Sequence, residues 1–571
     1  MAAFNIIYNN HKDIDFIETA LTGYDLLQNP KLNKGCAFTP EERDLFGLTG
    51  LLPHQVETLE QQVARMYMQY QEHHSNLGKN IYLNMLHDYN ETLFYALVSQ
   101  HLEEMLPVIY TPTVGEAVAR FSLEHRKPRG IYISYADRHR IAEILDHRLS
   151  HEVDLIVVTD GEAVLGIGDQ GIGGMNISSA KLMVYTLCGG ISPHRVLPIQ
   201  LDVGTNNPHL LADPMYLGWR HERVHGQDYD DFIQAFVQAV MKKLPNVFLH
   251  WEDFGRDNAR RILTRYRETL CTLNGDMQST GVVALASVLA GVVGSGLPLA
   301  DHQIVIFGAG TAGVGIADQL YAAMCRVGIS EAKAKSHLWL LDKQGLLMES
   351  AALLPFQKAY AHKQEEVSGW ECRNKTRIDL YDVVKNVKPT ILVGCSTLGG
   401  AFTQEIVSLM AAQVARPVIM PLSNPTELSE AKPEDVLHWT KGKAMIATGS
   451  PFPDIFYDNR RYRIAQSNNA LAFPGIGLGA IAVRAKRLTD TMLAAATQAL
   501  SECSPVMQDR MAPLLPRLSE ARMVSFKMAM AVAATARQEG LAQIPETVSI
   551  ETAVKKVIWD PRYYPYRKVS Y

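Results

Sequence analysis

The spacing of hydrophobic and polar residues changes twice along the chain. Residues 1 to about 128 place apolar side chains at helical spacing, most clearly over Gln55–Tyr70 and Ile81–Met105, and show no strong alternating strand pattern. From about residue 129, short β-branched runs alternate with helical stretches such as Tyr229–Lys243. The runs are Asp154–Asp160, Val196–Asp202 and Val247–His250. Such alternation predicts a mostly parallel sheet with helices on both faces.

A second series of this kind begins near residue 301. Its apolar runs, each followed by a turn containing Gly, Asp or Ser, are Gln303–Phe307, His337–Leu341, Thr390–Val393, Pro417–Met420 and Ala444–Ala447. Helical patterning returns from Gln466, over Leu488–Leu500 and Arg522–Gln538. We therefore predict an α/β protein with a helical N-terminal domain, two α/β units, the second doubly wound, and a tail. The expected boundaries are 1–128, 129–278 (completed by 467–538), 279–466 and 539–571.

One uncharged segment, Met277–Ala300, is long enough to span a bilayer. It is rich in Gly, Ala and Ser, contains a Pro and runs directly into the next element. A buried helix of a large soluble protein is therefore the better interpretation, and we expect no membrane association.

Composition and charge narrow the class of protein. The 571 residues carry 55 Lys and Arg against 60 Asp and Glu, a net charge of −5, which argues against a broad nucleic-acid surface or attraction to an anionic membrane. The seven cysteines are scattered and form no Cys-x-x-Cys pair, so a reducing compartment is expected. The first residues lack the pattern of a signal peptide, and we expect a cytoplasmic protein.

A glycine-rich motif, Gly308-Ala-Gly310-Thr-Ala-Gly313, lies between a predicted strand and a predicted helix over Val314–Cys325. In this context the motif predicts a dinucleotide site, with the pyrophosphate at the helix N-terminus. The next strand ends at Asp342, whose carboxylate would accept hydrogen bonds from a ribose and repel a 2′-phosphate, favouring NAD over NADP. Asp342 comes 29 residues after Gly313, so the helix between them must be long.

The segment Gly166-Ile-Gly168-Asp-Gln-Gly171 fits the same template. Asp169 would lie near the phosphates, which is unfavourable. A backbone turn that shapes a substrate pocket is therefore the better interpretation.

Three carboxylates could hold a divalent ion. Glu252 and Asp253 follow an apolar run, and Asp276 lies on a separate loop. Oxygen ligands of this kind suit Mg²⁺ or Mn²⁺, although acidic pairs are more often solvated surface.

Four more residues are candidates for a site. Lys181 begins an apolar helical pattern, where it is either solvated or, if placed near a cation, a base with a lowered pKa. Tyr110 ends an apolar run and is either packed or functional. Asn424 follows a predicted strand and Asn469 precedes Phe473-Pro-Gly; each could line a ligand crevice or simply form a turn.

These motifs, taken in order, resemble the malic enzyme family. The resemblance covers residues 30 to 540 and is carried by Phe94 through Val108-Ile-Tyr110-Thr-Pro-Thr113, Val157-Val-Thr-Asp-Gly161, Leu165-Gly-Ile-Gly-Asp169, Lys181-Leu182, Leu201-Asp-Val-Gly-Thr-Asn206, Trp251-Glu-Asp-Phe254, the Gly308 loop, Pro421-Leu-Ser-Asn-Pro425, Ala447-Thr-Gly-Ser450 and Asn468-Asn469 to Pro474-Gly475. It implies that the first α/β unit binds substrate and metal and that the second, Rossmann-type unit binds NAD.

The resemblance also implies roles for the candidate residues. Glu252, Asp253 and Asp276 would hold Mn²⁺ or Mg²⁺. Lys181 would accept the hydroxyl proton of L-malate during hydride transfer to NAD⁺, and Tyr110 would protonate C3 to give pyruvate after CO₂ leaves. Asn424 and Asn469 would bind the substrate carboxylate and groups near the nicotinamide. A homodimer or homotetramer is expected. The helical N-terminal region and the tail would either form the contacts between subunits or pack within their own chain.

Two positions depart from the family pattern. Ala163 stands where an arginine usually pairs with a malate carboxylate, and Gly275 stands where an aspartate usually orients the lysine. Malolactic enzymes, which retain NAD and form lactate, also lack that arginine and carry a segment similar to Leu249-His-Trp-Glu-Asp-Phe-Gly255. Two alternatives to a malic enzyme therefore stay open: a malolactic enzyme, and a catalytically weak NAD-binding regulatory subunit.

Overall fold

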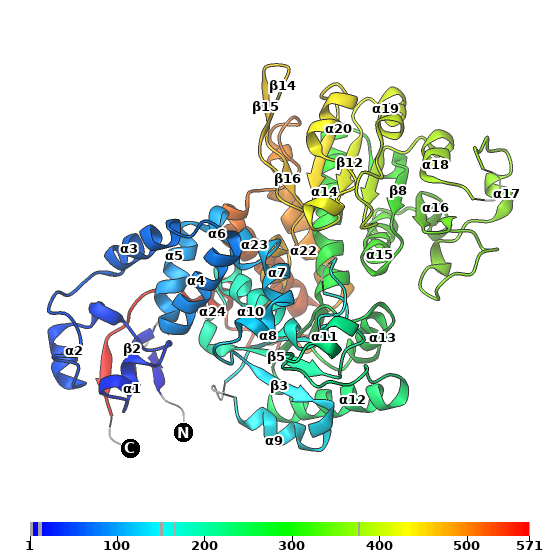
Figure 1. Cartoon of the computed structure of the whole chain (residues 1–571). Helices are drawn as coiled ribbons and strands as arrows, with labels where there is room; N and C mark the ends of the chain where they lie inside the picture. The colour runs from blue at the N-terminus through cyan, green and yellow to red at the C-terminus, as the bar shows by residue number, and fades with distance from the viewer. Residues whose placement is uncertain (1–3, 9–13, 149–151, 165, 375–376, 570–571) are drawn as a thin grey trace.

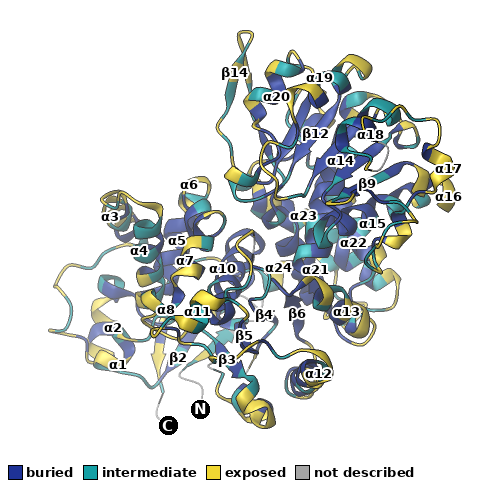
Figure 2. Cartoon of the chain, turned by 45° about the vertical axis from the view of Figure 1, so that its right-hand side comes forward, coloured by how far each residue is buried: buried dark blue, intermediate teal, exposed yellow. Residues whose placement is uncertain are grey.

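The computed structural model describes residues 4–8, 14–148, 152–164, 166–374 and 377–569. Figure 1 shows three regions: a group of helices from the first part of the chain, a first α/β unit beside them, and a second α/β unit above the first. The chain termini lie near each other, next to the N-terminal helices. The sheets of both α/β units are buried between helices (Figure 2). This is the α/β architecture that the sequence predicts.

The first α/β unit contains a five-stranded parallel sheet in the order β3-β5-β4-β6-β7. The strands are β3 (Ile131–Ser134), β4 (Leu155–Thr159), β5 (Val196–Asp202), β6 (Phe248–Trp251) and β7 (Thr272–Asn274). The helices of this unit are α9 (Ile141–Asp146), α10 (Met175–Val184), α11 (Pro208–Ala212), α12 (Gly226–Lys243) and α13 (Arg256–Tyr266). Since all pairs are parallel, the strands end at one edge, where Glu252 and Asp276 follow β6 and β7.

The second unit contains a seven-stranded sheet in the order β10-β9-β8-β11-β12-β13-β16. Its strands are β8 (Ile304–Phe307), β9 (Leu338–Asp342), β10 (Gly345–Leu346), β11 (Ile391–Gly394), β12 (Val418–Pro421), β13 (Met445–Thr448) and β16 (Ala465–Gln466). Only β10 is antiparallel. The strand order reverses at β8, between β9 and β11, which is where a doubly wound sheet binds its ligand.

Helices cover both faces of this sheet. They are α15 (Thr311–Arg326), α16 (Glu331–Ser336), α17 (Gln364–Val367), α18 (Leu380–Val387), α19 (Gln404–Gln413) and α20 (Pro433–Trp439). A hairpin of β14 (Ile455–Tyr457) and β15 (Arg460–Tyr462) projects from the unit (Figure 1). The residues between Gly313 and Asp342 thus form two helices, α15 and the short α16, instead of the single long helix expected.

The long uncharged segment forms helix α14 (Thr280–Ser295). Together with the preceding turn it makes the one stretch, Gly275–Ser295, in the described part of the chain that is long and apolar enough to span a membrane, and 78% of its most apolar part is buried inside the protein. The helix packs against α15 and against α22 (Asp490–Glu502). The apolar side chains of this helix are therefore mostly buried in the protein core.

C-terminal helices connect the two units. Helix α21 (Phe473–Ala482) packs on α23 (Ala521–Gln538) and on the helical turn Tyr185–Gly189 that continues α10. The glycines of α21 allow close approach: a side chain at Gly475 or Gly479 would collide with α23. The C-terminal helices thus pack against the first unit.

The N-terminal region is helical over most of its length, as expected, but the sequence analysis missed a small sheet. Its helices are α1 (Gly23–Leu27), α2 (Pro40–Leu45), α3 (Leu59–Gln71), α4 (Asn76–Tyr89), α5 (Glu91–Gln100), α6 (Leu102–Ile109), α7 (Thr113–Ala119) and α8 (Phe121–Glu124). Strand β2 (Ile14–Thr19) pairs with β1 (Asn5–Tyr8) on one side and with β17 (Tyr566–Lys568) on the other. The tail, which ends in β17 and follows α24 (Ile550–Val557), therefore packs within its own chain.

Candidate active site

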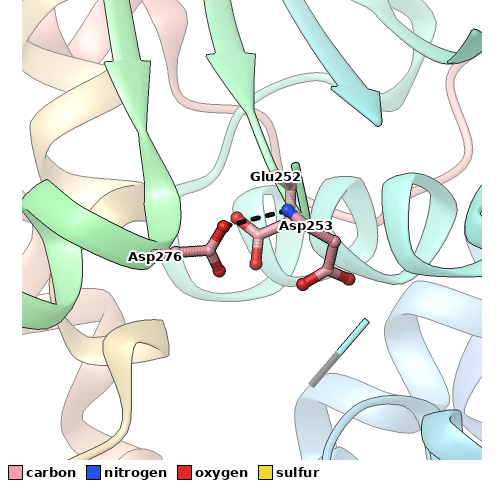
Figure 3. A group of neighbouring side chains, drawn as sticks. All are labelled: Glu252, Asp253 and Asp276. Carbon is pink, nitrogen blue, oxygen red and sulfur yellow. Dashed lines mark hydrogen bonds between the residues drawn. The ribbon is translucent and has the colours of Figure 1, made fainter. Parts of the chain in front are cut away.

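Three carboxylates meet at the carboxyl edge of the first sheet. One oxygen each from Glu252, Asp253 and Asp276 can be chosen so that all three lie within 4.8 Å of one another. Figure 3 shows the three side chains next to each other, with the backbone N–H of Asp253 donating to Asp276 Oδ2 at 2.9 Å. Asp253 takes a left-handed backbone conformation, φ 58°, at the turn after β6. This turn and the end of β7 therefore bring the predicted metal ligands together.

The pKa values of Glu252 and Asp276 are strongly shifted. Burial, and then the nearby Glu252 carboxylate, raise the pKa of Asp276 to about 8. Burial alone would also raise the pKa of Glu252, but the Lys181 ammonium and His250 lower it to about 2. Crowded, buried carboxylate oxygens with unfavourable mutual repulsion are a donor set that suits a hard divalent cation. The residues present thus fit Mg²⁺ or Mn²⁺.

Lys181 is fully buried on α10, which excludes the alternative of a solvated lysine. Its Nζ lies 2.8 Å from Glu252 Oε1 and 4.4 Å from the centre of the Phe473 ring. Burial alone would lower the pKa of Lys181, but Glu252 and Tyr110 raise it above the ordinary value. The direction is opposite to the lowering expected beside a cation, because the nearest charged group is a carboxylate.

Tyr110 and Asn469 complete the group around the lysine. Asn469 Oδ1 accepts hydrogen bonds from the Tyr110 hydroxyl at 3.2 Å and from Lys181 Nζ at 3.5 Å. Burial raises the pKa of Tyr110, which keeps its hydroxyl protonated. Asn469 follows β16 of the second sheet, whereas Lys181 comes from the first unit, so the carboxyl edges of both sheets contribute to one site.

The three glycines of the Gly308 loop have different surroundings. A side chain at Gly308, φ 109°, would collide with Cys395 at the end of β11, and one at Gly313 would collide with the Gly308 carbonyl. Among the described residues, a Cβ added at Gly310 would meet only Arg256 Nη2, at 4.0 Å. A dinucleotide pyrophosphate requires such a loop. Gly308 makes the tight turn, Gly313 allows the close helix contact, and Gly310 leaves the backbone open between them.

Asp342 lies at the end of β9, beside this loop. Its Oδ2 accepts a hydrogen bond from Gln357 Nε2 at 2.8 Å, and the same amide group donates to the Ala309 carbonyl at 2.8 Å. Lys343 is exposed. Gln357 thus holds the Asp342 carboxylate beside the Gly308 loop.

Asn424 bonds to a residue outside the group around Lys181. Its Oδ1 accepts a hydrogen bond from Ser450 Oγ at 2.6 Å, and no hydrogen bond within the described residues links it to Lys181 or Tyr110. A side chain at Gly166 would come within 2.7 Å of the Asn424 carbonyl. The second glycine-rich segment therefore packs its turn against Asn424.

Asp169 of that segment is held by protein groups. It accepts hydrogen bonds from Arg223 Nε at 2.7 Å, Thr205 Oγ1 at 2.8 Å and the Asn206 backbone at 2.7 Å. These bonds favour a structural turn at residues 166–171 and argue against a nucleotide-binding loop there.

Two family models match consecutive parts of the chain. The model of the malic enzyme N-terminal domain matches residues 87–267, and that of the malic enzyme NAD-binding domain matches residues 277–537. The chain is 50% identical over 558 residues to a protein of Bacillus subtilis named NAD-dependent malic enzyme 3, covering 97% of this chain and 98% of the relative. It is 48% identical over 547 residues to the NAD-dependent malic enzyme of Proteus mirabilis, covering 96% and 97%.

The chain belongs to the malic enzyme family.

Solved malic enzyme structures share the fold. The crystal structure of Entamoeba histolytica malic enzyme matches with a TM-score of 0.55 and 20% identity, covering 90% of each chain. That of the malic enzyme from Pyrococcus horikoshii matches with a TM-score of 0.53 and 22% identity, covering 80% of this chain and 88% of the other.

Two further buried residues of this malic enzyme site, His250 and Tyr185, are not among those predicted from the sequence. Buried His250 contacts Tyr185 Oη with Nδ1 and Glu252 Oε2 with Nε2, both at 2.7 Å. Burial lowers the pKa of His250 despite the carboxylate. An ionised carboxylate can only accept hydrogen bonds, so the neutral His250 ring carries its proton on Nε2 and donates it to Glu252 in a hydrogen bond. Nδ1 then accepts a hydrogen bond from the Tyr185 hydroxyl. One signal for His250 is present in the sequence, its place two positions before the candidate ligand Glu252. That spacing alone does not indicate a role for the histidine.

His250 also explains the departure at Gly275. A side chain at Gly275 would overlap Glu252 Oε2 and His250 Nε2. The space next to Glu252 is therefore occupied by an imidazole from the neighbouring strand, and a side chain at position 275 does not fit there. The second departure, Ala163, lies close by and donates its backbone N–H to the Asp253 carbonyl at 3.0 Å.

Proposed function

We propose that this protein catalyses the oxidative decarboxylation of L-malate to pyruvate and CO₂ with reduction of NAD⁺, in the presence of Mg²⁺ or Mn²⁺. The observation that carries the proposal is the meeting of Lys181, Tyr110 and Glu252 in one buried group beside Asp253 and Asp276. The names of the relatives at 48–50% identity, NAD-dependent malic enzyme, favour this reaction over the malolactic one. The meeting of these candidate groups argues against a catalytically weak subunit.

Glu252, Asp253 and Asp276 would hold the divalent ion, and the Gly308 loop with Asp342 would hold NAD⁺. The ion would supply positive charge that stabilises oxyanions on the substrate. It would also compete with the Lys181 ammonium for the Glu252 carboxylate. NAD⁺ would supply the hydride acceptor.

The protein's own side chains then move two protons. Glu252 keeps Lys181 Nζ as an ammonium, and a divalent ion that took this carboxylate would let Nζ lose that proton. The neutral amine would then accept the proton of the C2 hydroxyl as the hydride leaves C2, and the C–C bond to the departing carboxylate would break to release CO₂. Tyr110, kept protonated by burial, donates its proton to C3 and gives pyruvate. Asn469 Oδ1, which contacts both groups, orients them for the same substrate.

Product analysis tests this proposal directly. Incubation with malate, NAD⁺ and Mn²⁺ should give pyruvate and NADH in equal amounts. Lactate without net NADH would instead indicate the malolactic reaction, and no product would indicate the regulatory subunit. Lys181→Ala and Tyr110→Phe should each lower kcat by about 10²- to 10⁴-fold, whereas the exposed-site controls Lys333→Ala and Tyr24→Phe should not change it.

The proposal includes a cytoplasmic homodimer or homotetramer. All seven cysteines are free, as expected in a reducing compartment. The tail is used within its own chain, which leaves the N-terminal helices as the contact surface we propose. Analytical ultracentrifugation of the full chain would measure the assembly, and a monomer at all concentrations would contradict it.

A further inference from the structure

A cavity lies at the amino-terminal edge of the second sheet. It has a volume of about 420 Å³ and is lined by the start of β13, the end of α20, the β14–β15 hairpin and the loop 509–517. Arg416 and Met445 border it at the amino ends of β12 and β13, whereas Asn424 and Ser450 follow the carboxyl ends of the same strands. A four-residue strand spans roughly 13 Å. The cavity is therefore separate from the predicted NAD and malate sites.

Its charge is unusual for this protein. Five arginines line it, at positions 416, 460, 461, 463 and 517, against the aspartates 454 and 509, while the whole chain has a net charge of −5. Asp454 is already paired with Arg461, at 2.5 Å, and Asp509 accepts the backbone N–H of Met511 at 2.9 Å. Arg517 lies 3.9 Å from Glu103. The five arginines against two aspartates still leave an excess of positive charge in the lining.

Three of these arginines have no ion pair within the described residues: Arg416, Arg460 and Arg463. Arg416 donates to the backbone carbonyls of Gly294 at 2.7 Å and Arg510 at 3.0 Å, and Arg463 donates to that of Leu515 at 2.7 Å. Burial, and then neighbouring arginines, lower the pKa of both Arg416 and Arg463. Backbone carbonyls fix the guanidinium groups in place without neutralising them, so an anion that entered would relieve their repulsion.

The wall and the volume of the cavity restrict which anions could fit in it. Apolar groups, among them Leu437, Ile446 and Ile464, form part of the wall. The volume falls within the range of sites for small organic molecules. Guanidinium forks match the oxygens of a phosphate group in pairs.

We propose that this cavity binds a small organic phosphate, with the phosphate among Arg416, Arg460 and Arg463 and the organic part against the apolar wall. The proposal does not depend on the proposed catalytic function, because it uses none of the same residues.

Calorimetric titration of the full chain, saturated with NAD⁺ and held at constant ionic strength, tests the site. Phenyl phosphate and pyrophosphate should each bind at one site per chain, and phenyl phosphate should bind more tightly than inorganic phosphate because of the apolar wall. Arg463→Gln and Arg460→Gln should each weaken binding by about tenfold or more. Arg460 lies exposed on the hairpin, so its substitution leaves the fold intact.

The matched control is Arg140→Gln, an exposed arginine in the first unit, which should bind phenyl phosphate like the unaltered protein. No saturable binding, or binding that Arg460→Gln leaves unchanged, would overturn the proposal. Equal affinity for citrate would show a general anion patch and would overturn the assignment to phosphate.

Discussion

At the scale of single residues, the site depends on the space next to Glu252. A methyl group at Gly275 would overlap Glu252 Oε2 and His250 Nε2, so Gly275→Ala should displace the Glu252 carboxylate. We expect a loss of about 1–3 kcal/mol in unfolding free energy and at least tenfold weaker Mn²⁺ binding, measured by denaturation and calorimetry. Gly369→Ala is the matched control, since nothing lies within 4 Å of the added group. Unchanged Mn²⁺ affinity in Gly275→Ala would show that Glu252 is not a ligand.

The missing arginine gives a second residue-level prediction. Ala163 is half-buried and adjoins the carboxylate group through its bond to the Asp253 carbonyl. Ala163→Arg would add a guanidinium able to pair with a malate carboxylate. The KM for malate should fall by about tenfold, while the KM for NAD⁺ stays the same. Ala163→Gln, which adds length without charge, should not reproduce the effect, and identical kinetics of all three proteins would reject this role for the position.

The pH dependence of metal binding follows from Asp276, whose pKa is about 8. Below that pH a metal ion must displace its proton, so Mn²⁺ affinity should rise by about tenfold per pH unit from pH 6 and level off above pH 8. Asp276→Asn should flatten this profile, and a flat profile in the unaltered protein would contradict the raised pKa. Because the folded protein binds this proton more tightly than the unfolded chain, its contribution to stability is present at low pH and is lost as pH rises from about 4 through about 8.

At the scale of elements, the N-terminus of α13 faces the Gly308 loop. Arg256 begins this helix, where a positive charge opposes the helix dipole, and its Nη2 is the atom nearest to the open face of Gly310. We interpret it as a contact to the NAD pyrophosphate. Arg256→Gln should raise the KM for NAD⁺ by about tenfold without changing that for malate. Arg265→Gln, in the last turn of the same helix, serves as control; equal NAD⁺ kinetics in both variants would exclude the contact.

The parallel strands could be predicted from the sequence because each is a short buried run that ends in a polar turn. The predicted run Val196–Asp202 coincides with β5, and the run Gln303–Phe307 differs from β8 by one residue. The predicted helix Ile81–Met105, in contrast, is divided into α4, α5 and α6, where Asn90 caps α5 with its side chain. Continuous apolar spacing does not reveal such breaks, because consecutive helices can all face one core.

The site was predictable to the extent that its residues follow strands or resemble family motifs. The contact of Lys181 with Glu252 joins residues far apart in the sequence, and only the family resemblance indicated it. His250 could not be found in this way, because its role depends on the space left by Gly275, which follows the neighbouring strand β7. The same limit applies to β1, β2 and β17, since β17 comes from the far end of the chain.

At the scale of the whole molecule, the tail holds the N-terminal sheet and helices together. Tyr566 of β17 is buried, packs edge-on against Phe38 and Phe46, and donates its hydroxyl hydrogen to the Leu32 carbonyl at 2.9 Å. The Lys34 ammonium lies 3.8 Å from the centre of its ring. Both ends of the chain therefore stabilise one small core of their own, separate from the core that carries the site.

Tyr566→Ala should open this small core while leaving the site intact. Removing a buried aromatic ring costs about 3–5 kcal/mol, which exceeds what a core of this size can lose without local unfolding. Hydrogen exchange should increase over residues 14–52 and stay unchanged in β6 and β7, and kcat should be retained. The exposed Tyr24→Ala is the control. If exchange in β6 and β7 rose equally, the chain would unfold as a single cooperative unit, and the separate N-terminal core would be disproved.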